Sequence, residues 1–161
     1  MAEKQEQPIG RFVGDKIEVD DKEGRTWCFD LLVQEVLADV EKWFDRQRQN
    51  RLFEFAKESN VPPNIMTAML TSQGMQPVTL EMVFDAMQSP SGMEYTLWRC
   101  MRTHHANINR ADVSRKWNFK ERIKIMSELV EASGFGKDDD DDADPTQSQP
   151  EIELHGDKPS A

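Results

Sequence analysis

Cys100, His104 and His105 are the residues whose types and spacing come nearest to a metal site. Cys100 and His104 are four residues apart, so they share one face if this stretch is helical. Zinc takes three or four protein ligands, whereas the chain has two cysteines, three histidines and no second cluster of them. We therefore interpret Cys100 as a buried thiol and the histidines as residues of a helix end, where the helix dipole favours them. The sequence predicts neither a metal site nor a cofactor.

The sequence contains no catalytic signature such as a glycine-rich phosphate loop, an HExxH motif or a nucleophile elbow. Gly134-Phe135-Gly136-Lys137 resembles a phosphate loop only superficially, because no strand precedes it and no helix follows. Asp20 and Asp21 are adjacent and lack the alternating oxygen ligands of a calcium loop. We expect no catalytic residues and no enzymatic activity. The alternative is a diffuse active site, which a cleft with converging polar groups of perturbed pKa would reveal.

Methionines concentrate in the middle of the chain. Seven of the nine lie between residues 66 and 101: Met66, Met69, Met75, Met82, Met87, Met93 and Met101. Their thioethers are flexible and polarizable, so a methionine-rich surface adapts to varied helical partners. We predict that four of them bind an apolar helical partner: Met66, Met69, Met82 and Met87. The alternative is that these side chains fill gaps in a small core.

The charge of the chain is divided between a body and a tail. Residues 1–136 hold 21 acids and 18 bases, a net charge of −3, whereas residues 137–161 hold nine acids and two bases, a net charge of −7. Successive carboxylates repel one another and bury no apolar surface, so we expect a disordered acidic tail that folding does not need. Residues 1–136 then form one folded domain. An acidic chain without clustered lysine and arginine argues against a nucleic-acid partner.

The sequence also predicts where the protein works. The first residues are polar and lack the apolar segment of a signal peptide. No apolar run approaches the ~20 residues that cross a bilayer. Two cysteines in apolar neighbourhoods fit free thiols in a reducing compartment better than a disulfide framework. We therefore expect a cytosolic protein that has no membrane partner.

The N-terminal part of the chain predicts a β-hairpin. Residues 16–19 alternate polar and apolar, as a half-buried strand does, and residues 25–29 return after a turn at residues 20–24. Residues 10–14 can form a short extended piece before the hairpin. The expected fold is mainly α, of the α+β class: an N-terminal β-hairpin, a compact multi-helix domain and the acidic tail.

Helical periodicity dominates the rest of the body. Asp30 is expected to cap a helix whose apolar residues continue to Phe44, and residues 45–51 are polar all round, as in a solvated continuation or a break. Asn64, Thr79 and Asn109 are candidate starts of later helices. Gly134 is a candidate end of the last one. The predicted core contains Trp27, Trp43, Phe44, Trp98 and Leu129.

The order of these features resembles the tail assembly chaperones of long-tailed bacteriophages. The passage from residues 16–19 through 25–32, from hairpin into helix, is similar to the start of those proteins. Residues 94–105, which end in Thr103-His104-His105, resemble their aromatic helix with a basic-histidine turn. Residues 107–113 resemble the start of their next helix. The family often has proline after that histidine, where this chain has Ala106.

This resemblance implies a helical domain that binds the tape measure protein, the long helical rod that sets tail length. The chaperone would keep this rod soluble and help recruit tail tube subunits during virion assembly in the host cytoplasm. The resemblance also implies two product lengths through −1 ribosomal frameshifting, and our hypothesis places the slip at the codons of Gly136 and Lys137. The alternative function is a small acidic regulatory or anti-host adaptor that binds protein through its Asp-rich tail. The sequence predicts no oligomeric state.

Overall fold

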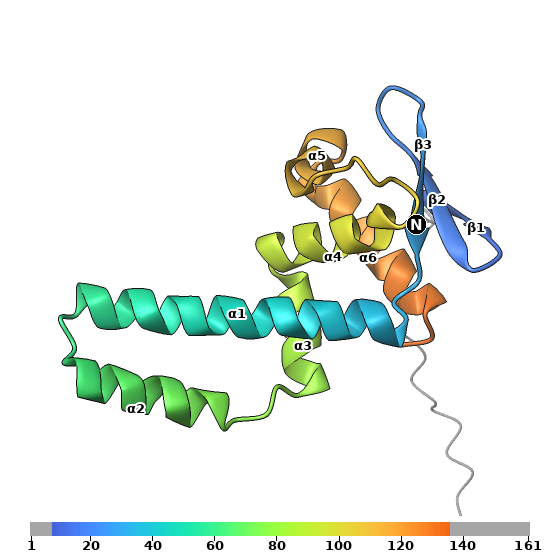
Figure 1. The fold of residues 1–161 in the computed structure, drawn as a ribbon. Helices are drawn as coiled ribbons and strands as arrows, with labels where there is room; N and C mark the ends of the chain where they lie inside the picture. The colour runs from blue at the N-terminus through green and yellow to red at the C-terminus, as the bar shows by residue number, and fades with distance from the viewer. Residues whose placement is uncertain (1–7, 136–161) are drawn as a thin grey trace, which may run out of the picture.

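The computed structural model describes residues 8–135, in which a three-stranded sheet precedes six helices (Figure 1). The strands are β1 (Gly10–Val13), β2 (Lys16–Asp20) and β3 (Thr26–Asp30). The helices are α1 (Gln34–Glu58), α2 (Pro63–Gly74), α3 (Leu80–Gln88), α4 (Pro90–Arg102), α5 (Arg110–Lys116) and α6 (Phe119–Ala132). This arrangement confirms the α+β fold class. The acidic tail, the domain boundary at residue 136 and the frameshift site at Gly136-Lys137 lie outside the described residues.

The sheet is an antiparallel meander in the order β1-β2-β3. The predicted hairpin corresponds to β2 and β3, where Ile17 lies opposite Phe29 and both side chains are fully buried. The piece expected to be merely extended pairs with β2 as a full strand. This strand is held from outside the sheet, because the N–H groups of Ile9 and Gly10 donate to the carboxylate of Glu128 on α6 at 2.6 and 2.8 Å.

The turn between β2 and β3 is organised by Asp21. Its carboxylate accepts hydrogen bonds from the backbone N–H groups of Glu23 and Arg25 at 2.9 and 3.0 Å, and from the indole N–H of Trp27 at 2.8 Å. Burial acts to raise the pKa of this carboxyl, but the three donors and the Arg25 guanidinium lower it to about 2. Gly24 completes the turn at a φ of 75°, a conformation that glycine adopts without strain.

α4 is the central helix of the body. It packs against β3, α1, α3, α5 and α6. Leu97, Cys100 and Met101 on this helix are fully buried. Trp117, which follows α5, is 1% exposed and packs against Phe29 with ring centroids 5.5 Å apart. The core therefore lies around α4, between the sheet and the other helices.

α1 continues beyond the body and forms an arm with α2. The polar residues 45–51, which were compatible with a continuation or a break, continue the helix without interruption. α2 lies alongside the far half of α1 after a short turn (Figure 1). Residues 45–80 are termed the arm, and no residue of α2 is buried. None of the helices within residues 8–135 is long and apolar enough to cross a membrane.

Three helix ends follow the predicted local chemistry. The side-chain oxygens of Thr79 and Asn109 accept hydrogen bonds from the first turns of α3 and α5, so both residues are N-caps as predicted. Gly134 follows α6 at a φ of 84°, the left-handed conformation common after a helix. These ends depend on a few neighbouring residues, which explains why the sequence predicts them.

Two predicted caps are wrong. Asp30 stays in β3, where its carboxylate contacts His104 just after the end of α4, and α1 begins at Gln34 without a side-chain cap. Asn64 lies inside α2, because Pro63 already occupies the first helical position, for which its fixed φ suits it. In both places a neighbour that the local pattern does not weigh decides where the helix begins.

The predicted core is confirmed in part. Three of its residues lie within the core or pack against it: Leu129, Trp27 and Trp98. Trp43 and Phe44 lie outside the described core as partly exposed side chains of α1, and Trp43 stacks on Tyr95 with ring centroids 4.9 Å apart. The fully buried tryptophan is Trp117, which the sequence did not single out. Periodicity finds the apolar face of α1 but not the point at which the body stops covering it.

This difference predicts unequal costs for two tryptophan substitutions. Trp117→Ala should lower the free energy of unfolding by about 3–5 kcal/mol, because it leaves a cavity in the core. Trp43→Ala should lower it by less, about 2 kcal/mol, because the variant loses one aromatic stack and the burial of an only partly covered side chain. Urea unfolding followed by far-UV circular dichroism measures both. Equal costs for the two variants would contradict the placement of Trp43 outside the core.

Candidate protein-binding surfaces

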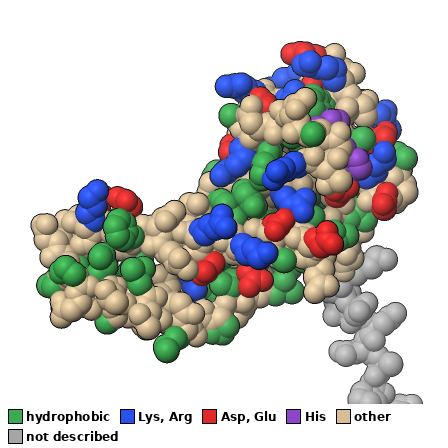
Figure 2. All heavy atoms as spheres, in the orientation of Figure 1, with side chains coloured by type: hydrophobic (Ala, Val, Ile, Leu, Met, Phe, Trp, Pro, Cys, Tyr) green, Lys and Arg blue, Asp and Glu red, His purple; other side chains and the backbone are tan. Residues whose placement is uncertain are grey.

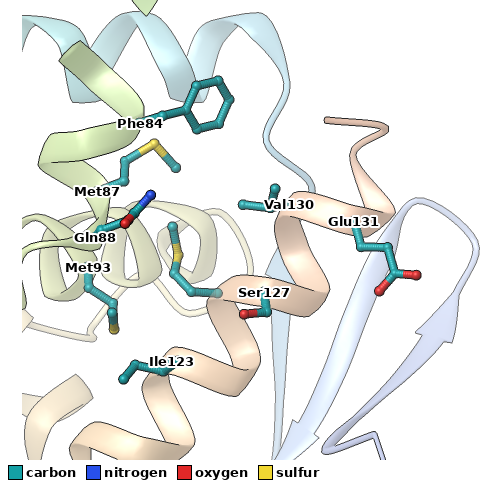
Figure 3. Close-up of a pocket in the computed structure, with 9 residues that line it drawn as sticks. Phe84, Met87, Gln88, Met93, Ile123, Ser127, Val130 and Glu131 are labelled. Atoms are coloured by element: carbon teal, nitrogen blue, oxygen red, sulfur yellow. The ribbon is translucent and has the colours of Figure 1, made fainter. Parts of the chain in front are cut away.

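An apolar groove opens between α3, α4 and α6 (Figure 3). Its volume is about 510 Å³. It is termed the methionine groove and is lined by Phe84, Met87, Gln88, Met93, Ile123, Met126, Ser127, Val130 and Glu131. Six of these nine side chains are apolar and three carry thioethers, so the groove offers an adaptable apolar surface.

The joint between α3 and α4 sets one wall of the methionine groove. Ser89 ends α3 and also caps α4: its hydroxyl donates to the carbonyl of Ala86 at 2.6 Å and accepts from the N–H of Gly92 at 3.1 Å. A Cβ atom at Gly92 would lie 1.8 Å from the Ala86 carbonyl oxygen. Only glycine permits this approach, so the joint holds Met87 and Met93 toward α6, as Figure 3 shows.

The methionine groove has a buried floor and an exposed lip. Met87, Met93 and Met126 are 1%, 3% and 6% exposed, so their side chains belong to the core as well as to the groove. Ile123 on α6 is 42% exposed at the lip. Large apolar side chains at such a lip are ready to be covered by a partner.

The arm presents a second apolar surface. Residues 59–80 contain no charged side chain in a chain that is 31% charged. Large hydrophobic side chains nevertheless stand exposed on the arm: Phe53, Phe55, Ile65, Met75 and Leu80. Figure 2 shows hydrophobic side chains gathered over the far end of the arm, where charged side chains are sparse. The uncharged run at residues 59–80 is the signal in the sequence that marks this surface.

A groove of about 380 Å³ runs along the arm between α1 and α2, and it is termed the arm groove. It is lined by Phe44, Gln47, Arg48, Arg51, Leu52, Phe55 and Gln73. Arg48 fixes the end of α2, because its guanidinium donates to the carbonyls of Gln73 and Gln76 at 3.2 Å and contacts Asp45 at 2.9 Å. These contacts of Arg48 therefore hold α1 and α2 at the spacing that forms the arm groove.

The structure separates the four methionines predicted to bind a partner. Met66 and Met69 are partly exposed on α2 of the arm. Met82 is partly exposed on α3, beside Trp43. Met87 lies in the floor of the methionine groove and is almost fully buried. These side chains therefore lie in separate places on the molecule, and their binding to a partner stays a prediction.

Cys100 and His104, the residues that come nearest to a metal site in the sequence, contact different parts of the structure. Cys100 is fully buried, and burial raises the pKa of its thiol to about 12. His104 lies against Asp30, with Nε2 and Oδ1 2.6 Å apart. Across residues 8–135, no three histidine, cysteine, aspartate or glutamate side chains are grouped so that they could hold a metal ion. Cys100 and His104 thus serve packing and the contact between α4 and β3.

His105 joins the end of α4 to the sheet. Its Nε2 accepts a hydrogen bond from the backbone N–H of Cys28 at 3.0 Å, and its ring lies 4.7 Å from that of Trp27. Burial lowers the pKa of His105, and the nearby positive groups of His104 and Lys116 lower it further. The neutral ring is therefore the form that holds β3 in place.

No protein-family model, curated protein or solved structure matches this chain. The resemblance to tail assembly chaperones therefore remains an expectation from the sequence.

The role of His105 predicts a pH dependence of stability. Its pKa in the folded protein lies below the unfolded value of ~6.5, so the unfolded chain binds more protons as the pH falls. The stabilisation is complete above about pH 6.5 and is lost as the pH falls toward the folded pKa. The urea midpoint of the wild type should fall more between about pH 7.5 and about pH 5.5 than that of His105→Gln. Equal falls would show that His105 does not stabilise the fold as a neutral acceptor.

Proposed function

We propose that this protein is a chaperone without catalytic activity that holds an amphipathic helix of a partner protein in the methionine groove. The observation that carries the proposal is the open apolar groove of about 510 Å³ with three thioethers in its floor. This volume falls within the ~300–1,000 Å³ range of binding pockets. A helix lying in such a groove inserts apolar side chains spaced three or four residues apart.

The chemistry of the methionine groove suits varied apolar side chains. Met87, Met93 and Met126 each have an unbranched side chain that repacks around different shapes at low cost. Ser127 and Glu131 at the rim supply polar atoms that orient a bound helix without closing the groove. These properties favour a partner with repeated apolar stripes over a single small ligand.

The resemblance to tail assembly chaperones supports the tape measure protein as the partner. Before tube subunits surround it, such a rod exposes apolar helical stripes, and covering them keeps it soluble. Under this proposal the protein acts in the host cytoplasm, and its Asp-rich residues 138–142 help to keep the complex soluble. A longer frameshifted form would add a tethered segment that raises the local concentration of tail tube subunits.

Co-expression with the proposed partner, a tape measure protein whose gene we expect just downstream, tests this function. The wild-type chain should keep that protein in the soluble fraction and co-purify with it. Ile123→Asp places a carboxylate at the lip of the methionine groove, where a bound apolar helix would strip its water. The affinity measured by calorimetry should fall at least ~10-fold.

Val33→Asp is the matched control. Val33 is also an exposed apolar residue, and it lies at the N-cap of α1 outside the methionine groove, where aspartate is a favoured residue. This variant should bind like the wild type. Unchanged binding by a folded Ile123→Asp variant would exclude the methionine groove, and failure of the wild type to solubilise the partner would exclude the chaperone function.

A further inference from the structure

The arm groove lies beside the exposed ring of Phe55. Phe55 is 55% exposed and projects from the tip end of the groove. Arg51 and Leu52 line the groove about one turn of α1 nearer the body. One face of the arm thus presents an exposed aromatic ring beside a hollow lined by both apolar and basic side chains. When two copies of such a face meet about a two-fold axis, each ring faces the hollow of the other copy.

Charges along the same face of α1 change sign between its two ends. Gln47, Arg51, Glu54 and Glu58 are spaced four, three and four residues apart, so they lie in one row. The basic residue is nearer the body and the two acids are nearer the tip. Two such rows running antiparallel bring Arg51 of each copy to the acids of the other. A parallel arrangement would instead align like charges.

The net charge of the arm also favours contact between identical chains. Residues 45–80 contain four bases and three acids, a net charge of +1, whereas the whole chain carries −10. The rest of residues 1–136 carries −4, so two copies approaching through their bodies would bring together surfaces of like negative charge. Approach through the arms avoids this repulsion, and α2 adds an apolar helix without any charge.

We propose that the arm is a self-association surface, on which a second copy of this chain packs its own arm antiparallel to the first. The two α1–α2 pairs then form a four-helix bundle, and Phe55 of each copy enters the arm groove of the other. This site lies on α1 and α2, whereas the methionine groove lies between α3, α4 and α6. The self-association therefore does not depend on the proposed chaperone function.

The size of the contact sets the expected affinity. The shared face of α1 from Gln49 to Glu58 is about 15 Å long, and two helices side by side are about 20 Å wide. The face therefore covers roughly 300 Å², less than half of the ~800 Å² that each partner buries in an interface of standard size. We expect a reversible dimer with a dissociation constant in the micromolar range.

Sedimentation velocity of the full chain from about 5 to about 500 μM, a range that brackets a micromolar dissociation constant, tests this proposal. The wild type should shift from monomer to dimer across this range. Phe55→Lys should raise the dissociation constant at least ~10-fold, because it places an ammonium group in a hollow that Arg48 and Arg51 line. Phe53→Lys is the matched control: Phe53 is 45% exposed and about 200° around α1 from Phe55, so this variant should dimerise like the wild type.

A charge exchange tests the antiparallel arrangement. Arg51→Glu alone should weaken the dimer, and Arg51→Glu combined with Glu54→Arg should restore it, because the opposite charges meet again. A wild type that stays monomeric at the highest concentration would overturn the proposal. Equal effects of Phe53→Lys and Phe55→Lys, or no rescue by the double variant, would overturn the assigned face and orientation.

Discussion

The enclosure of α4 is the constraint on which the rest of the fold depends. Its buried residues form one face that covers about half of the circumference of the helix: Gly92, Met93, Thr96, Leu97, Cys100 and Met101. A helix with so wide a buried face is stable in water only when several other elements cover that face. The sheet, α1, α3, α5 and α6 supply that cover. The polar member of the set, Thr96, satisfies its hydroxyl by donating to the carbonyl of Gly92 at 2.8 Å.

Both candidate surfaces lie where the elements packed around α4 extend past it or leave a gap beside it. The 13 residues of α4 span about 20 Å and the 25 residues of α1 span about 37 Å, so roughly half of α1 has no central helix to pack against. That excess forms the arm with α2. The methionine groove arises differently: α3 and α6 both pack against α4 but leave a groove whose floor is formed by the almost fully buried Met87, Met93 and Met126. In each place the apolar surface is a result of how α4 is enclosed.

The sequence predicts features that depend on near neighbours and misses those that depend on distant ones. The β2–β3 hairpin and the Thr79 and Asn109 caps follow from residues within a few positions. β1 becomes a strand with the help of Glu128, more than a hundred residues away, and no local pattern contains that contact. Trp43 and Met87 show that a local pattern does not predict burial: Trp43 was expected in the core and is partly exposed, whereas Met87 was expected on a surface and is almost fully buried. Both lie on apolar helix faces, yet only Met87 is covered by the body.

The arm's position outside the core has a consequence for how this sequence can change over time. Because no residue of α2 is buried, substitutions there alter the surface while costing the fold little free energy. Gly92 and Trp117 have no such freedom, since one permits the close α3–α4 approach and the other fills the core. Selection on what the arm contacts can therefore act almost independently of selection on folding. Related chains should diverge fastest between residues 59 and 80, and should be recognised by the residues that enclose α4.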